Sequence, residues 1–242
     1  MCHRAENGEI DNVQVVVKIG GSLLYRQDGH ADLERIRSIA DSIRAIVDEG
    51  HSLIVIVGGG RPAREFISTA RSLGASETQC DWIGIKIARL NAELLCAALG
   101  EYAYPKIVES LDELETAVES GKVILMGGLT PAQSTNAVAA LAAEVIGADM
   151  LLNATNVDGV YDRDPKEPGA TLLDTVTVSE LERILSAGSV RAGEYRLFDP
   201  VAIRVVNRSR IRTVIFNGTD SQNILRLVRG ERIGTHIIPE ES

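Results

Sequence analysis

Apolar residues in this chain fall alternately into short continuous runs and into helical repeats. A continuous run of branched aliphatic residues predicts a buried strand, and apolar spacings of three and four predict an amphipathic helix. Strands are expected at Val13–Ile19, Leu53–Val57, Lys106–Val108, Lys122–Met126, Asp149–Ala154, Arg212–Phe216 and Thr235–Ile238. Helices are expected at 32–49, from Pro62 to about Leu73, at Asp81–Leu99, Leu111–Ser120, 136–147 and Ser179–Ser186, after Asp199-Pro200, and at Ser221–Arg229.

This alternation predicts an α/β fold of three layers, with a mostly parallel central sheet and helices on both faces. The polar residues 1–12 are expected to form a flexible lead-in, and residues 13–242 a single domain. In such sheets, ligands bind beyond the carboxyl ends of the strands.

Glycine pairs or triplets follow three of the predicted strands. They are Gly20-Gly21, Gly58-Gly59-Gly60 and Gly127-Gly128. A bare turn lets main-chain N–H groups approach a phosphate without a Cβ in the way. Three such turns at one edge of a sheet indicate more than one phosphate, as in a nucleotide donor and a phosphorylated acceptor.

Two basic residues lie beside these turns. Lys18 precedes the first glycine pair by two residues and could neutralise charge on a transferred phosphoryl group, or it could simply reach solvent from a strand end. Arg64 lies one turn into the helix after the glycine triplet and could bond a phosphate. A tight strand–helix turn needs one glycine, so it explains three poorly.

The third turn leads into Ser134-Thr135-Asn136, all good helix caps. With Thr130 they also offer hydroxyls and an amide for a sugar or base. Tyr161 lies in a segment rich in turn formers and suits an adenine or ribose site, although an ordinary long loop would look the same.

Composition excludes several functions. The net charge is −9 with no basic run, which argues against nucleic-acid binding. No apolar run approaches the roughly 18 residues that span a bilayer. The three cysteines lack metal-ligand spacing, and a reducing cytoplasm fits them best. The carboxylates at 158, 162 and 164 lack the terminal Glu of a calcium loop, so no dedicated metal site is expected.

Several motifs together resemble the amino acid kinase superfamily and, more narrowly, the archaeal-type uridylate (UMP) kinases. The resemblance covers roughly residues 13–238. It is carried by Lys18-Ile-Gly-Gly-Ser22, Val-Gly-Gly-Gly-x-x-x-Arg64, the stretch Cys80–Leu95, Thr155-Asn-Val-Asp-Gly-Val-Tyr161, Asp164-Pro and Phe198-Asp-Pro-Val-Ala.

The resemblance implies transfer of the ATP γ-phosphoryl group to UMP, giving UDP, with Mg²⁺ held mainly through nucleotide phosphates. It implies a cytoplasmic homohexamer built as a trimer of dimers. Within the domain, about 13–150 would bind the acceptor and about 151–242 the nucleotide donor.

The resemblance also implies roles for individual residues. Lys18 would stabilise the in-line transition state, with Asn136 as the second catalytic position. ATP would be bound by Gly21, Ser22, Gly60, Arg64, Thr155, Asn156, Tyr161 and Asp164. UMP would be bound by Gly59, by Asp81 through the ribose, and by Leu129, Thr130, Pro131, Ala132, Gln133, Ser134 and Thr135.

Two departures from the family pattern keep alternatives open. Asn136 stands where the family usually has an Asp that orients the lysine, and Ala132-Gln133 replace residues where related sequences often carry a Gly. The alternatives are a kinase of another small phosphomonoester, or a storage protein that binds nucleotide or oxyanion without turnover. The histidine that isopentenyl phosphate kinases carry near the second glycine turn is absent here.

Overall fold

The computed structural model describes residues 12–164, 167–186 and 198–240, and within them a seven-stranded sheet has the order β3-β2-β1-β4-β6-β7-β5. All neighbours pair in parallel except β6 and β7. The strands are β1 (Gln14–Ile19), β2 (Ser52–Val57), β3 (Ile124–Met126), β4 (Met150–Thr155), β5 (Thr175–Thr177), β6 (Arg212–Asn217) and β7 (Thr235–Ile238). The predicted mixed, mostly parallel α/β architecture is therefore confirmed.

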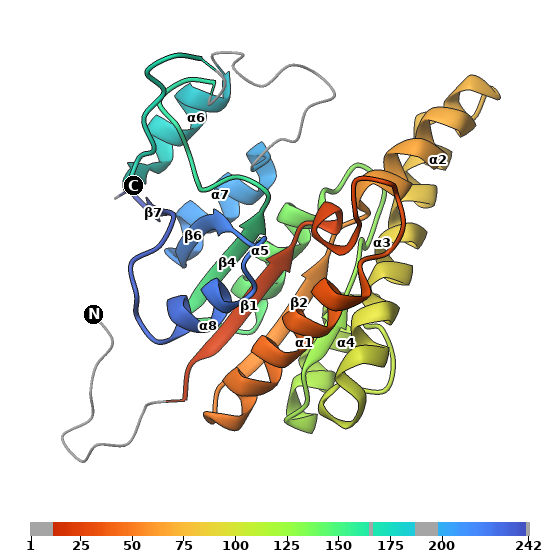
Figure 1. The fold of residues 1–242 in the computed structure, drawn as a ribbon, viewed down its shortest axis with the longest axis horizontal. Coiled ribbons are helices and arrows are strands. Elements are labelled where there is room, and N and C mark those ends of the chain that lie inside the picture. The colour runs from red at the N-terminus through yellow and green to blue at the C-terminus, as the bar shows by residue number, and fades with distance from the viewer. Residues whose placement is uncertain (1–11, 165–166, 187–197, 241–242) are drawn as a thin grey trace.

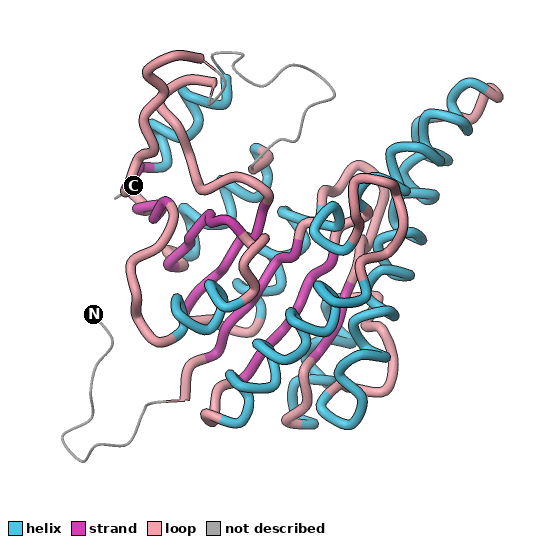
Figure 2. The backbone as a smooth tube through the Cα atoms, viewed as in Figure 1, coloured by secondary structure: helices cyan, strands magenta, loops and turns pink. Residues whose placement is uncertain are grey.

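Helices cover both faces of this sheet. They are α1 (Leu33–Asp48), α2 (Gly60–Ser72), α3 (Glu77–Leu99), α4 (Leu111–Ala117), α5 (Thr135–Val145), α6 (Val178–Ser186), α7 (Pro200–Ser209) and α8 (Gln222–Val228). In Figure 1, α1 and α8 lie over the near face and α5 over the far face, and Figure 2 shows the strands as one layer between them. Alternate residues of each strand enter one of two hydrophobic cores, one on each face.

Local sequence explains where most helices begin. Asp32 caps α1 by accepting from the N–H of Arg35. Asp199 caps α7, with Pro200 in the first turn. Ser76 and Gln79 form a reciprocal capping box at the start of α3. This box explains why α3 begins at Glu77, before the predicted start at Asp81.

Two short segments differ from the prediction. Lys106–Val108 was expected to be a strand, but it contributes only an isolated bridge between Val108 and Met126. Thr175–Thr177 was not predicted, yet it forms β5 because β7 offers it an edge to pair with. Three residues are too short for a period-two pattern to stand out, so pairing decides both cases.

The α2–α3 hairpin extends beyond the sheet at the upper right of Figure 1. In the described part of the chain, no helix combines the length and the apolar character that a membrane span needs. Nearly all of the predicted lead-in, residues 1–11, lies outside the described residues.

Candidate functional site

The first two glycine turns interlock at the carboxyl ends of β1 and β2. An ideal Cβ on Gly21 would lie 2.1 Å from the carbonyl oxygen of Gly58, and one on Gly60 would lie 2.5 Å from the carbonyl carbon of Gly21. Gly60 also has a φ of +65°, a conformation that side chains disfavour. These glycines are therefore required by the contact between the turns, whatever ligand approaches them.

Each of these turns opens a helix. Gly21 begins a 3₁₀ helix that ends at Leu24, and Gly60 begins α2. The first N–H groups of a helix have no partner within it, and the helix dipole makes that end attractive to anions. The two helix starts meet, so the geometry suits two neighbouring phosphates.

The third glycine turn packs against α3. A Cβ on Gly127 would lie 2.7 Å from the backbone nitrogen of Arg89, and one on Gly128 would lie 2.8 Å from Cγ1 of Ile85. Arg89 Nε donates to the carbonyl of Gly128 at 3.0 Å, and its guanidinium also pairs with Glu109. The turn is thus held by a buried close contact and by a charge-assisted hydrogen bond.

Lys18 and Asn136 are both almost fully buried near this edge. Lys18 is 2% exposed on β1, where its register partners are Ile56 on β2 and Asn153 on β4. Asn136 is 6% exposed in the first turn of α5, and Asn153 is 1% exposed. Each of the three residues takes part in an interaction with its surroundings. Sequence reasoning did not single out Asn153.

Of the three expected cap residues at α5, Ser134 is the cap. Its Oγ accepts from the N–H groups of Asn136 and Ala137, and its hydroxyl bonds to the Asp199 carboxylate. Thr135 Oγ1 lies 3.4 Å from the position that a Cβ on Gly58 would take. The start of α5 therefore joins the two interlocked turns.

Asp81, expected to contact a ribose, holds the 129–135 loop. Its Oδ2 accepts from the backbone N–H of Ala132 at 2.9 Å. Ala132 has a φ of +62°, which an alanine adopts only at a cost. In the same loop Leu129 is buried, Pro131 is half-buried, and Thr130 Oγ1 donates to Gln133 at 3.1 Å.

Residues expected to bind the adenine nucleotide follow β4. Thr155 is buried, and its hydroxyl bonds the backbone of Val157 in both directions, at 3.1 and 3.0 Å, so it shapes the turn. Asn156 is exposed and Asp164 half-buried. Tyr161 is half-buried, and its hydroxyl donates to Asp158 at 3.1 Å.

Asp158 connects this turn to the end of β6. Its other oxygen accepts from Asn217 Nδ2 at 2.8 Å. Burial, followed by the hydrogen bond to Asp158, raises the pKa of Tyr161, so its hydroxyl stays protonated and can donate. The link to the first glycine turn comes from Gly218, whose ideal Cβ would lie 2.8 Å from Cδ1 of Leu23.

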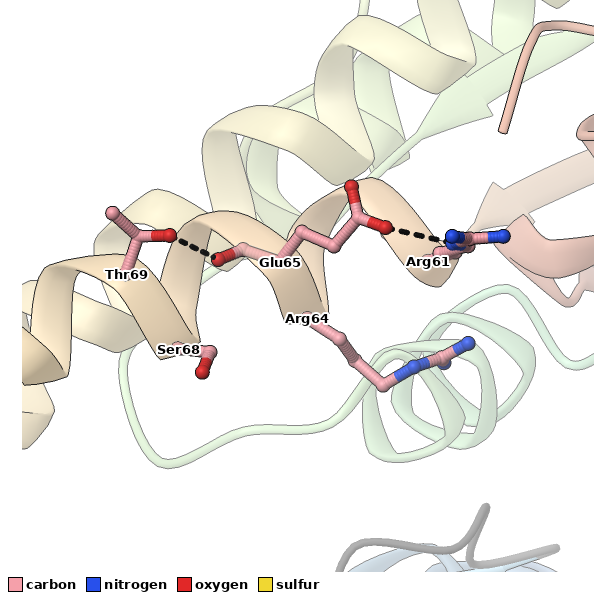
Figure 3. A pocket seen from close by; sticks show the side chains of 5 residues that line it. All are labelled: Arg61, Arg64, Glu65, Ser68 and Thr69. Carbon is pink, nitrogen blue, oxygen red and sulfur yellow. Dashed lines mark hydrogen bonds and ion pairs between the residues drawn. The ribbon is translucent and has the colours of Figure 1, made fainter. Parts of the chain in front are cut away.

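Two arginines at the start of α2 point in different directions. Arg61 pairs with Glu65 and donates to the carbonyl of Gln27 at 2.7 Å. Figure 3 shows Arg64 extending away from that pair. Arg64 is exposed and forms no ion pair with the described residues, so its guanidinium remains available for an anion.

Sequence reasoning missed several residues that organise the site. Arg89, Asn91 and Asp158 act through backbone or side-chain contacts whose partners lie far along the chain. Asp199 was recognised only as a helix cap, and its contact with Ser134 spans 65 positions. No local spacing signals such pairs.

Comparisons with known proteins show the family and the fold of this chain. Residues 14–217 match the Amino acid kinase family. The chain is 48% identical to the uridylate kinase of Methanothermobacter thermautotrophicus over 229 residues, covering 94% of this chain and 100% of that protein. The structure of the Archaeoglobus fulgidus uridylate kinase superposes with a TM-score of 0.81 at 42% identity, covering 92% of this chain and 99% of that one. The Bacillus anthracis UMP kinase, at 22% identity, 94% and 96% coverage and a TM-score of 0.76, shares the fold.

Proposed function

The chain belongs to the amino acid kinase family, and from that premise we propose how its site performs uridylate kinase chemistry. The enzyme transfers a phosphoryl group from ATP to UMP, giving ADP and UDP. The observation that carries the site assignment is the meeting of the first glycine turn, the N-terminus of α2 and the start of α5 at the end of the strand that bears buried Lys18. Such an edge accommodates two phosphates with the transferred group between them.

The donor and acceptor occupy different parts of this edge. Gly21, Ser22 and Gly60 supply N–H groups to the ATP phosphates, and the segment from Thr155 to Asp164 borders the adenosine. Residues of about 151–242 thus form the donor part of the domain, and about 13–150 the acceptor part.

The acceptor lies toward α3 and α5. UMP is surrounded by Gly59, Asp81 and the loop Leu129–Thr135. Asp81 and this loop lie together, since the Asp81 carboxylate accepts from the N–H of Ala132. Arg64 was assigned to the ATP phosphates, and its available guanidinium suits that role. Ala132 and Gln133 depart from the family pattern in the loop assigned to the acceptor. These two positions are where a different acceptor would be recognised.

Lys18 acts on the transferred group. Its burial keeps competing water away, so its charge interacts strongly with the oxygens of the phosphoryl group. Transfer of this kind depends on alignment and on charge neutralisation more than on a strong base. Asn136 holds the geometry through its amide but supplies no negative charge.

We propose Mg²⁺ as the cation of the reaction. The described residues contain no group of three His, Cys, Asp or Glu side chains able to hold a metal. Mg²⁺ in kinase sites keeps several of its waters and binds mainly through substrate phosphates. When bound, Mg²⁺ neutralises charge on the phosphates.

We also propose a homohexamer arranged as a trimer of dimers. The α2–α3 hairpin carries five large apolar side chains that are exposed: Phe66, Leu73, Trp82, Leu90 and Leu94. Exposed apolar residues in this number support an interaction surface on the hairpin.

An assay of acceptors tests the activity. Phosphoryl transfer from ATP with Mg²⁺ is measured for UMP, CMP, dUMP and isopentenyl phosphate, with fast and selective formation of UDP expected. Binding of ATP without transfer to any of them would contradict the proposal.

Replacing Lys18 tests the mechanism. Lys18→Ala should lower kcat by about 10²–10³-fold while the KM for ATP changes little, because its contact strengthens in the transition state. Lys122→Ala is the control, since this exposed lysine only bonds the carbonyl of Glu101. Equal losses in kcat and in ATP binding for Lys18→Ala would refute its role.

A further inference from the structure

Asn91 on α3 is a buried amide whose hydrogen bonds go to the second glycine turn. It is 1% exposed. Its Nδ2 donates to the carbonyl oxygens of Gly58 at 2.8 Å and Gly59 at 3.2 Å, and its Oδ1 accepts from the hydroxyl of Tyr25 at 2.6 Å. Both N–H donors of the amide are therefore used. An apolar side chain of the same size would fill this place without the cost of burying an amide. The hydrogen bonds to the turn therefore explain why an amide is present here.

Anchoring these carbonyls fixes the direction of the next N–H groups. In a trans peptide the C=O and the following N–H point in opposite directions. The structure has no cis peptide among its described residues. With the carbonyls of Gly58 and Gly59 turned toward α3, the N–H groups of Gly59 and Gly60 are directed away from it. Asn91 thereby sets the orientation of two adjacent peptide planes at once.

These two N–H groups belong to different substrates in the proposed function. Gly59 lies on the acceptor side, and Gly60 opens α2 beside the first turn. A glycine triplet has wide conformational freedom and would not keep this arrangement by itself. Backbone hydrogen bonds hold the Gly58 N–H to the carbonyl of Ile19 at 2.9 Å and the Gly59 carbonyl to the N–H of Ala63 at 3.4 Å. The amide adds a side-chain constraint that acts on both carbonyls at once.

Tyr25 extends the same constraint to the first glycine turn. It directly follows the 3₁₀ helix Gly21–Leu24, and its N–H donates to the carbonyl of Ser22 at 3.4 Å. Its hydroxyl reaches Asn91, 66 positions away along the chain. One side chain of α3 thus ties both phosphate-facing turns to a single rigid helix.

We infer that Asn91, supported by Tyr25, is a positioning residue for phosphoryl transfer that fixes the peptide planes of Gly58–Gly60 relative to the first turn. The inference rests on the proposed function. Asn91 acts through the backbone, so its removal should misalign donor and acceptor. Small misalignments lower the rate of transfer steeply.

The test replaces Asn91 with residues of similar or smaller size. Asn91→Asp keeps the shape and the acceptor for Tyr25, but places a carboxylate oxygen against two carbonyls. It should lower kcat by about 10–100-fold at saturating substrates, with smaller changes in both KM values. Lowering the pH should restore part of kcat relative to wild type, because a protonated carboxyl can donate one hydrogen bond. If Asn91→Asp does not fold, Asn91→Ser replaces it, since it removes both donors without burying a charge.

A matched variant separates positioning from stability. Ser42→Ala removes a hydroxyl that is 1% exposed and bonds Ser221 at 3.2 Å between α1 and α8. It should lower the melting temperature and leave kcat unchanged. If the Asn91 variants keep the wild-type kcat per folded molecule, Asn91 is only structural and the inference fails. If the wild-type enzyme does not phosphorylate UMP, the proposed function fails instead. Calorimetry of ATP binding by the wild type and the Asn91 variants still tests the effect of Asn91 on the turn.

Discussion

At the scale of single residues, the glycines have two separate reasons to be glycine. The first reason, expected from the sequence, is that a turn without Cβ atoms lets main-chain N–H groups approach a phosphate. The structure adds steric reasons, since a Cβ on Gly59 would lie 2.5 Å from that of Ala63, and one on Gly127 would meet the backbone of Arg89. Loss of function in a glycine variant therefore does not by itself identify a ligand contact.

Ala132 is one of two non-glycine residues with a positive φ in the described part of the chain, together with Arg210. A φ of +62° costs a non-glycine residue about 1–2 kcal/mol of folding free energy. Glycine avoids this cost, but it makes the unfolded chain more flexible, which lowers stability by about 0.5–1 kcal/mol. Ala132→Gly should therefore raise the free energy of unfolding by about 1 kcal/mol, measured by urea denaturation. Ala45→Gly, inside α1, should lower it by about the same amount. A loss at both positions would show that Ala132 is not strained.

At the scale of elements, α3 organises the loops of the proposed acceptor side. Asp81, Arg89 and Asn91 bond loop backbone at Ala132, Gly128 and Gly58. The three side chains come from one helix, so their spacing along α3 fixes the positions of the loops relative to one another. This is why glycine-rich segments can form a defined site.

Strand β7 carries a histidine that should make stability depend on pH. Burial first, and then Arg212 and Arg232, lower the pKa of His236, while Asp174 opposes this shift. The folded state therefore binds the proton less readily than the unfolded state. The contribution of His236 to the free energy of unfolding is therefore fully present above about pH 6.5, the pKa of an unfolded histidine. It is lost as the pH falls from there toward the lower pKa of the folded state.

Urea denaturation of His236→Gln between about pH 7 and 5 measures this contribution. The variant should lose less stability over that interval than the wild type. His30→Gln, in an exposed loop, serves as the control and should follow the wild type. Identical pH profiles for all three proteins would rule out His236 as the cause.

At the scale of the whole molecule, the exposed apolar side chains of the projecting α2–α3 hairpin underlie the proposed self-association. Light scattering coupled to size exclusion should give the mass of a hexamer for the wild type. Leu90→Glu, at a side chain 63% exposed on α3, should yield smaller species because a charge on an apolar interface is costly to desolvate. Val145→Glu, 38% exposed on α5, should remain hexameric. A monomeric wild type would contradict the proposed assembly.

Local sequence patterns predicted the succession of strands and helices, the three-layer α/β class and the strand-end position of the glycine turns. These follow from local periodicity and from residue types with strong backbone preferences, such as Asp199-Pro200 at the start of α7. The motifs also identified the family, since they combine short stretches of fixed spacing.

How these parts meet depends on packing in three dimensions, which local patterns do not contain. The antiparallel placement of β7, the added strand β5, the interlocking of Gly21 with Gly58–Gly60 and the hydrogen bonds of Asn91 all join residues far apart in sequence. Thr155 is expected to bind ATP, and the structure shows that its hydroxyl bonds the backbone of its own turn. Such contacts depend on how packed elements approach one another, and an amide or a hydroxyl in the sequence does not reveal which backbone it will reach.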